Sequence, residues 1–345
     1  MNDIHVDEFL ELGEDAGRGN LLSVQAFMRP PDYASEESFY NKLAVYLAAG
    51  REKGWLGPRT VAVFPEYIGA WLATTGERAS VYTAGSLAEA MRRVALSHPL
   101  AFIRELLSAR EKDRLSASLL RLKSGQTAEL YDRVFSRLAR EFSLTIVAGS
   151  VLLPGAEVVE GHVRAQHGLI ENVSAVFRPD GTAYSTLVRK IYLIGMELPY
   201  VKAGEVEALA VFDTPAGRLG VLICADSWYP AVYARLKELG VELVAVPSYM
   251  NSEKLWQGSW GGYDGNAAPD DVDMEDVGSL TEAQAWRKYA LAGRLEACGA
   301  RCGVIAVLHG EFWDLGLAGG RGLLVRGEAQ VESGSTGAAL LNLWL

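Results

Sequence analysis

The chain contains 345 residues, of which 49% are hydrophobic, and its formal net charge is −10 at pH 7. This composition predicts a globular protein with a large core, and the negative charge would repel the phosphate backbone of a nucleic acid. The apolar runs are far shorter than the roughly 18–20 residues that span a bilayer, so we expect no membrane partner either.

The cysteines and the N-terminal residues bear on the cellular compartment. Three cysteines, Cys224, Cys298 and Cys302, are too few for a disulfide framework and indicate reduced thiols. Residues 1–20 are acidic where a secretory signal would be basic and then apolar, so we interpret them as an N-terminal arm that is mobile or caps the domain. Both features favour a cytoplasmic protein.

Apolar runs with the length of buried strands alternate with segments of helical periodicity. The predicted strands are, in chain order, Leu21–Phe27, Thr60–Phe64, Leu144–Leu153, Val173–Phe177, Thr186–Tyr192, Leu209–Phe212, Leu219–Cys224, Leu243–Val246 and Gly303–Leu308. The predicted helical segments are Glu36–Lys53, the long region Leu87–Phe142, Pro230–Leu239 and Leu280–Cys298.

Turn signals and the absence of linkers indicate how these elements are organised. Residues 178–181 (Arg-Pro-Asp-Gly) and 215–217 (Pro-Ala-Gly) each separate two apolar runs and predict hairpins. Because no Ser-, Gly- or Pro-rich linker interrupts the chain, we expect residues 21–345 to form one α/β domain of sheets covered by helices. One apolar helix face that should pack on a sheet is formed by Leu130, Val134, Phe135, Leu138 and Phe142.

Cys224 ends one of the predicted strands and precedes a helical segment that begins at Pro230. A thiol at such a turn lies near helix N–H groups, which favour a thiolate with a pKa below the free value of about 8.5 and can bind an oxyanion. A lone cysteine in apolar surroundings is more often a small buried hydrophobic side chain, so its position alone leaves the choice open.

Glu66 and Lys190 are the two other candidates for chemistry. Glu66 directly follows a predicted strand and Pro65, where burial would raise its pKa and suit it to proton transfer. A surface or helix-capping glutamate fits the same position. Lys190 lies within a strand-like run whose alternation could point it inward, although most lysines in such runs are exposed on edge strands.

Taken together, the three motifs resemble those of the nitrilase (carbon–nitrogen hydrolase) superfamily, whose catalytic Glu, Lys and Cys occur in this order at strand ends. The matching segments are residues 64–66 (Phe-Pro-Glu), 189–193 (Arg-Lys-Ile-Tyr-Leu) and 220–226 (Gly-Val-Leu-Ile-Cys-Ala-Asp). The resemblance extends from about Leu21 to Val325. It implies an α-β-β-α sandwich of two mixed sheets covered by helices, in subunits that form homodimers or higher homo-oligomers.

The resemblance also implies a role for each matched residue. Glu66 would take the thiol proton as Cys224 attacks the substrate, and would then deliver it to the departing ammonia or amine. Lys190 and the backbone N–H of Ala225 would stabilise the oxyanion of the tetrahedral intermediate.

Members of the family carry a second acid shortly after the lysine. Glu197 is the best match and would orient substrate or water, whereas its competitor Glu205 lies in what looks like the loop before the next strand. The segments 75–140 and 251–279 are longer than in compact members, so we interpret them as insertions that shape the pocket or the assembly.

Aromatic residues flank two of the motifs. Tyr67 and Trp71 follow the glutamate, and Trp228 and Tyr229 follow the cysteine, so all four are candidate walls of a substrate pocket. Packing in the core or at a dimer interface is an equal alternative for each of them. The other cysteines lack a second ligand pair and the histidines lack a metal-binding spacing, so we predict no metal and no cofactor.

The expected function is hydrolysis of a non-peptide carbon–nitrogen bond in a small amide-type substrate, through a thioester acyl-enzyme, with release of ammonia or an amine. Ala225 and Asp226 follow the nucleophile, whereas nitrile-cleaving members usually carry a Trp-Glu pair there. Nitrile and N-carbamoyl substrates remain alternatives. A catalytically silent scaffold of the same fold, which binds a ligand or partner and merely buries Cys224, is the non-enzymatic alternative.

Overall fold

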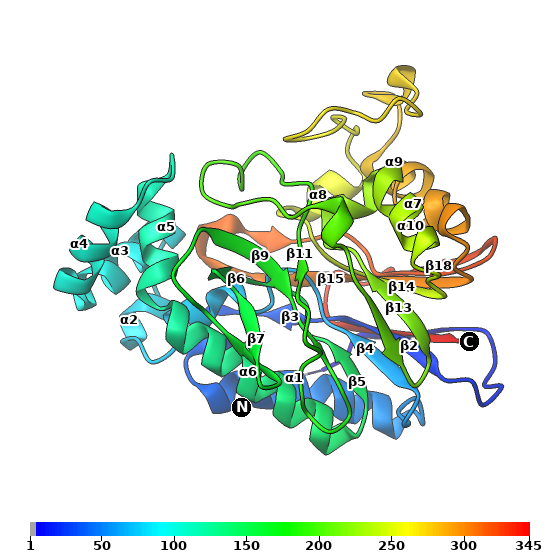
Figure 1. The fold of residues 1–345 in the computed structure, drawn as a ribbon, viewed down its shortest axis with the longest axis horizontal. Helices are drawn as coiled ribbons and strands as arrows, with labels where there is room; N and C mark the ends of the chain where they lie inside the picture. The colour runs from blue at the N-terminus through cyan, green and yellow to red at the C-terminus, as the bar shows by residue number, and fades with distance from the viewer. Residues whose placement is uncertain (1–4) are drawn as a thin grey trace.

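The computed structural model describes residues 5–345 and has two sheets packed face to face between layers of helices (Figure 1). The strand β4 (Thr60–Val63) shows why both faces of the first sheet are buried: Val61 and Val63 belong to one hydrophobic core and Ala62 to another. Successive side chains of a strand point to opposite faces of its sheet, so one face meets helices and the other meets the second sheet.

Both sheets mix parallel and antiparallel pairs. The first has the order β1 (Glu8–Leu12), β19 (Ala339–Trp344), β2 (Asn20–Gln25), β4, β5 (Thr145–Val147), β10 (Val176–Phe177). The second has the order β12 (Val211–Thr214), β13 (Gly217–Val221), β14 (Leu243–Tyr249), β15 (Cys302–Glu311), β17 (Leu323–Arg326), β18 (Ala329–Glu332), with β3 (Phe27–Met28) and β16 (Leu317–Ala318) also paired to β15. A smaller sheet has the order β11 (Val188–Arg189), β9 (Ile170–Ser174), β6 (Val151–Pro154), and a two-stranded ribbon joins β7 (Glu157–Val159) to β8 (His162–Arg164).

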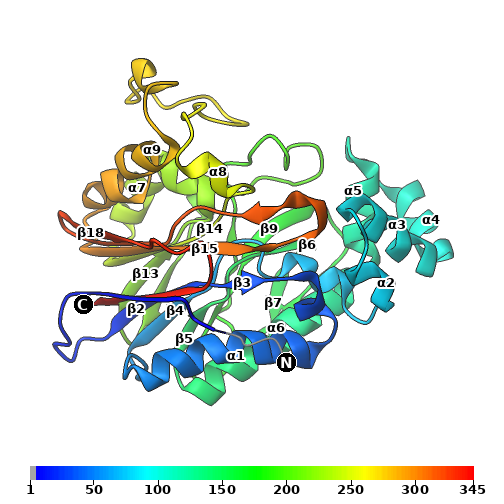
Figure 2. The same ribbon diagram turned by 180° about the vertical axis from the view of Figure 1, so that it is seen from behind.

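Helices cover the outer face of each large sheet and one end of the molecule, as the two opposite views in Figures 1 and 2 show. The first sheet is covered by α1 (Glu36–Glu52) and α6 (Ser124–Phe142), and the second by α7 (Pro230–Glu238), α9 (Glu282–Tyr289) and α10 (Leu291–Arg294). A group of shorter helices projects at one end: α2 (Ala79–Tyr82), α3 (Leu87–Ser97), α4 (Pro99–Ser108) and α5 (Arg114–Leu122). The α-β-β-α sandwich expected from the sequence is thus confirmed.

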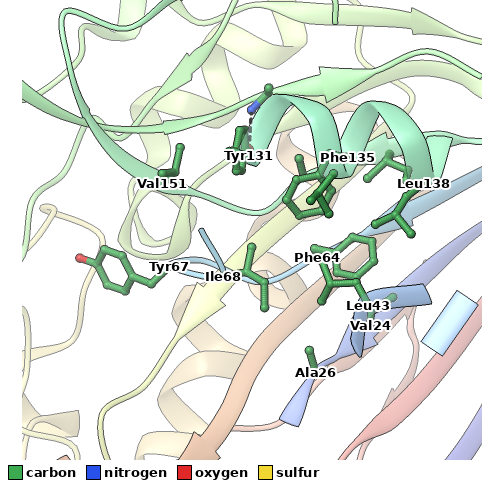
Figure 3. Packing of buried hydrophobic residues seen from close by; sticks show 14 of the residues in the cluster. Val24, Ala26, Leu43, Phe64, Tyr67, Ile68, Tyr131, Phe135, Leu138 and Val151 are labelled. Carbon is green, nitrogen blue, oxygen red and sulfur yellow. Dashed lines mark hydrogen bonds between the residues drawn. The ribbon is translucent and has the colours of Figure 1, made fainter. Parts of the chain in front are cut away.

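The apolar face expected between residues 130 and 142 is the buried face of α6, and all five of its predicted residues are buried. Phe135 is its central contact: its ring lies 5.4 Å from that of Phe64 and 5.0 Å from that of Tyr131, both in edge-on geometry. Figure 3 shows Tyr131, Phe135 and Leu138 projecting from α6 over the segment that follows β4. This packing fixes the chain directly before Glu66.

Both hairpin predictions are confirmed. The N–H of Arg178 donates to the carbonyl of Thr182 at 2.8 Å, which closes the turn after β10. At the second signal, β12 and β13 pair in antiparallel register, with Thr214 opposite Gly217.

Several expected strands differ in the structure: Leu21–Phe27 and Val173–Phe177 are each divided between two sheets, and three others change as follows. The run Leu144–Leu153 is two strands of different sheets, because the chain turns at Gly149, whose φ of 63° favours glycine and whose missing Cβ would lie 2.1 Å from the carbonyl oxygen of Pro65. The run Thr186–Tyr192 contributes only β11. The run Leu219–Cys224 ends as a strand at Val221, before the cysteine.

The segments near the two ends of the chain both contribute strands. Within the expected arm, Glu8–Leu12 form β1 and pair in parallel with β19, while residues 1–4 of the arm lie outside the described residues. Residues 328–345, for which the sequence indicated no assignment, supply all of β18 and of β19. None of the helices within residues 5–345 has the length and apolar character needed to cross a bilayer.

Candidate active site

Three segments bring Glu66, Lys190 and Cys224 into one buried site, each just after a strand. Glu66 follows β4, Lys190 follows β11, and Cys224 opens the short 3-10 helix η4 (Cys224–Trp228) that comes after β13. Their exposed fractions are 1%, 1% and 7%. The strand ends therefore bring a carboxyl group, an ammonium group and a thiol into the same enclosed space.

Lys190 is held between two carboxylates. Its Nζ lies 2.8 Å from Oε1 of Glu66 and 2.7 Å from Oε2 of Glu197, and both acids are buried. Oε2 of Glu197 also accepts a hydrogen bond from the N–H of Ile194 at 3.1 Å. The competitor Glu205 is exposed at the start of a 3-10 helix, so Glu197 is the second acid of this cluster.

Asn172, on β9, connects the two acids. Its Nδ2 donates to Oε1 of Glu66 at 3.0 Å and to Oε1 of Glu197 at 2.9 Å. Tyr67 donates its hydroxyl to the same oxygen of Glu197. These donors hold both carboxylates in place without neutralising either of them.

Burial and neighbouring charges set the protonation of this cluster. Burial raises the pKa of Glu66 above its usual range; Lys190 opposes the rise, and the charge of Glu197 adds to it. Burial alone would lower the pKa of Lys190, but the two carboxylates raise it well above its usual value. Lys190 is therefore a cation between two acids, and the raised pKa makes Glu66 a better proton acceptor than an ordinary carboxylate.

Cys224 has a strained backbone and a protonated thiol. Its φ is 49°, in the left-handed region that non-glycine residues rarely adopt, and Tyr67, next to Glu66, has a φ of 60°. The Sγ donates to the carbonyl oxygen of Tyr249 at 3.7 Å. Burial, followed by the charge of Glu66, raises the pKa of the thiol well above its usual value.

This thiol corrects one expectation. The sequence favoured a thiolate with a lowered pKa at a helix start, but η4 is a single short turn, and the thiol is desolvated beside an acid. Attack by the Cys224 sulfur would therefore require loss of this proton, and Glu66 is the carboxylate whose charge acts on the thiol.

Asp226, two residues after Cys224, accepts hydrogen bonds from two segments of the site. Its Oδ1 accepts from the N–H groups of Ile191 and Tyr192 at 2.9 and 2.7 Å, and its Oδ2 accepts from the N–H of Ile223 at 3.1 Å. It is fully buried, and burial raises its pKa to about 7. One side chain thus fixes the segment after Lys190 relative to the residue before Cys224.

The expected substrate-binding residues have different surroundings. Tyr67 and Trp71 line a cavity of about 200 Å³, and Ala225 is the second residue of η4. Trp228 and Tyr229 do not line this cavity. They pack in an aromatic cluster, with Trp228 stacked on Trp260 at 5.8 Å between ring centres.

Two further polar residues of the site carry weak sequence signals. Asn172 lies between Glu171 and Val173 and belongs to none of the three motifs. Only its hydrogen bonds in the folded protein identify it as part of the site. Asp226 stands inside the cysteine motif, but two of its three partners, Ile191 and Tyr192, come from a segment more than thirty residues away. Among residues 5–345, no group of three or more His, Cys, Asp or Glu side chains is arranged to hold a metal ion.

Comparison with known proteins extends these observations. A sequence model of the carbon–nitrogen hydrolase family matches residues 110–262, a segment that contains Lys190, Glu197 and Cys224. The Bacillus subtilis protein named "Probable hydrolase YhcX" is 25% identical over 149 residues, which cover 43% of this chain and 26% of that protein. An omega-amidase of Xenopus laevis, NIT2-A, is 30% identical over 134 residues, which cover 37% of this chain and 43% of that protein. The chain thus matches less than half the length of these relatives.

The fold has solved counterparts along nearly the whole chain. The crystal structure of an amidase from Nesterenkonia sp. has a TM-score of 0.54 to this structure at 15% identity, and the match covers 95% of this chain and 90% of that one. At that identity the likeness concerns the fold. The family match and the relatives thus show that part of this chain is similar to carbon–nitrogen hydrolases, in the segment that carries two of its three motifs, and the solved structure shows that the sandwich fold is shared along nearly the whole chain.

Proposed function

We propose that this protein hydrolyses the carbon–nitrogen bond of a small amide through a thioester on Cys224. The observation that carries the proposal is the buried cluster in which Lys190 bridges Glu66 and Glu197, with Glu66 close enough for its charge to act on the Cys224 thiol. Two buried carboxylates and one buried ammonium are costly to assemble in a core, and such perturbed groups gather at catalytic sites. The amidase and hydrolase relatives support the same reaction class.

In the first half-reaction, Glu66 accepts the proton of Cys224 as the sulfur attacks the amide carbon. The carbonyl oxygen becomes an oxyanion, which the Lys190 ammonium and the Ala225 N–H stabilise. Glu66 then returns the proton to the amide nitrogen, the carbon–nitrogen bond breaks, and ammonia or an amine leaves. A thioester remains on the sulfur.

In the second half-reaction, Glu66 takes a proton from water as the water oxygen attacks the thioester carbon. The carbon–sulfur bond breaks, the acid product leaves, and the proton returns to the Cys224 thiolate through Glu66. Glu197 keeps Lys190 oriented and charged throughout both steps. No cofactor is needed to balance this reaction.

Intact-protein mass spectrometry with coupled ammonia detection tests the proposal. Wild type, Cys224→Ala and the control Cys298→Ala are incubated separately with amides, nitriles and N-carbamoyl compounds. We expect ammonia from amides, and an acyl adduct on wild type and on Cys298→Ala only. An adduct that survives in Cys224→Ala, or ammonia from nitriles alone, would reject the proposed nucleophile or the proposed substrate class respectively.

A further inference from the structure

A cavity next to the cluster of Glu66, Lys190, Glu197 and Cys224 indicates which acyl groups the substrate can carry. It is bounded on one side by Tyr67 and Tyr249, whose rings meet edge-on at 5.5 Å. Tyr67 donates its hydroxyl to Glu197, and the carbonyl of Tyr249 accepts from the Cys224 thiol. The two tyrosines therefore contact the cluster of Glu66, Lys190, Glu197 and Cys224 and also line the cavity, which places the cavity next to that cluster.

The far wall of the cavity comes from the helices at the end of the molecule. Met91 and Val94 on α3 and Leu120 on α5 lie across from Trp71. The ring of Trp71 is held by stacking on Phe312 at 5.5 Å, so this side of the cavity is rigid. The segment between residues 75 and 140, which the sequence singled out as long, thus supplies part of the binding space.

Within the described residues 5–345, no charged side chain lines this cavity. Three of its hydroxyl groups already donate within the protein: Thr74 to the carbonyl of Trp71 at 2.8 Å, Ser116 to Asp113 at 2.6 Å, and Tyr67 to Glu197. The hydroxyl-bearing side chains of Tyr200 and Tyr249 also line the cavity, but most of its lining residues are aliphatic or aromatic, so the surface offered to a ligand is mainly hydrocarbon. A carboxylate placed there would lose its water without gaining a cation, which costs several kcal/mol or more.

From this geometry we propose that the acyl group of the substrate is uncharged and apolar, a medium-length alkyl or an aryl group that occupies this cavity with the amide carbon at Cys224. The inference rests on the proposed amide hydrolysis. The cavity is large enough, since roughly 150 Å³ lined by apolar side chains already accommodates a benzene ring, and this one has about 200 Å³. Met196, half exposed, and Leu315 lie at its mouth, where such a group would enter.

Matched substrates test the proposal. Hexanamide and adipamate, the monoamide of adipic acid, have the same number of carbons and differ in a terminal methyl or carboxylate. We expect kcat/KM to rise by about fourfold for each methylene from propanamide to hexanamide, as burial of hydrocarbon predicts. We expect the value for adipamate to lie at least about 100-fold below that for hexanamide.

Two variants test whether binding in the cavity causes this preference for longer alkyl groups. Leu119→Trp, on the cavity wall, should lower kcat/KM for hexanamide relative to propanamide by about tenfold or more. Leu96→Trp adds the same ring on α3 at a side chain that is 66% exposed and outside the cavity, and should leave that ratio unchanged. An equal effect of both variants would overturn the assignment of the cavity.

The outcomes separate this inference from the function on which it rests. Turnover of adipamate as fast as that of hexanamide would overturn the apolar acyl site and leave amide hydrolysis standing. If no amide is hydrolysed, the proposed function falls, and calorimetric binding to Cys224→Ala then decides the cavity alone. Measurable binding of hexanamide with none of adipamate supports an apolar ligand, and any other result rejects it.

Discussion

Replacing Asp226 with asparagine changes one buried hydrogen bond and one buried charge, and the two effects can be separated by pH. The amide oxygen of Asn keeps the bonds from Ile191 and Tyr192, while the amide nitrogen faces the N–H of Ile223 and cannot accept from it. An unsatisfied buried donor costs about 1–3 kcal/mol.

The charge of Asp226 makes the free energy of unfolding depend on pH, in a direction that its pKa determines. The pKa of Asp226 is about 7 in the folded protein against 3.8 as the ordinary value. A raised folded pKa gives stability that is fully present below 3.8 and is lost as pH rises through 7. Between pH 5.5 and 8.5 the wild type therefore loses about 2 kcal/mol from this group, and the variant does not.

We therefore expect Asp226→Asn to lower the free energy of unfolding by about 1–3 kcal/mol at pH 5.5, where the wild-type side chain is mostly neutral. At pH 8.5 the difference should shrink by about 2 kcal/mol. Since Ile223 directly precedes Cys224, kcat should fall by on the order of 10²-fold, the loss that a displacement of about 1 Å causes at a reacting group.

Urea unfolding at the two pH values, followed by tryptophan fluorescence, and steady-state ammonia release measure these effects. Asp213→Asn is the matched control, because the Asp213 side chain is 85% exposed. Equal destabilisation at both pH values would refute the raised pKa of Asp226. An unchanged kcat would show that its bond to Ile223 does not position the nucleophile.

Three further predictions concern the cluster and the core. Glu197→Gln should lower kcat/KM for an amide by about 100-fold, since Lys190 loses one of its two carboxylates; a loss below about fivefold in steady-state assays would contradict this role. The pH profile of kcat/KM should fall on the acid side above pH 4.5, because Glu66 must be deprotonated and its pKa is raised; full activity in folded enzyme below that pH would disprove it. Phe135→Ala should reduce the free energy of unfolding by about 3–5 kcal/mol in urea titration, whereas Leu100→Ala, at an 84% exposed side chain, should change it by less than about 0.5 kcal/mol; similar effects would argue against the packing under α6.

Local patterns in the sequence were sufficient to predict sheets covered by helices and to identify the three motifs. The apolar face of α6 and the two hairpin turns depend on neighbouring residues, so their periodicity and turn residues identify them. Glu66, Lys190 and Cys224 also carry motifs at strand ends. Their meeting in one buried site required the fold, because the residues are separated by 124 and 34 positions in the chain.

Features that depend on distant partners escaped prediction. Asn172 is recognisable only once Glu66 and Glu197 lie against it. The raised pKa of the Cys224 thiol follows from burial beside Glu66, which a local argument about helix N–H groups omits. Trp228 follows the nucleophile in the chain, but η4 turns its ring into the aromatic cluster.

The position of β19 has a consequence for the order in which this protein can fold. Residues 339–344 lie between β1 and β2, pairing in parallel with one and antiparallel with the other, so two strands from the beginning of the sequence are joined only through one from near residue 345. During synthesis, β1 therefore cannot pair until β19, more than three hundred residues later in the chain, has been made. Pairing over such separations is slow and leaves strand edges open meanwhile. A nascent chain halted before residue 339 should thus be captured by chaperones or proteases, whereas a chain that already includes β19 can close its first sheet.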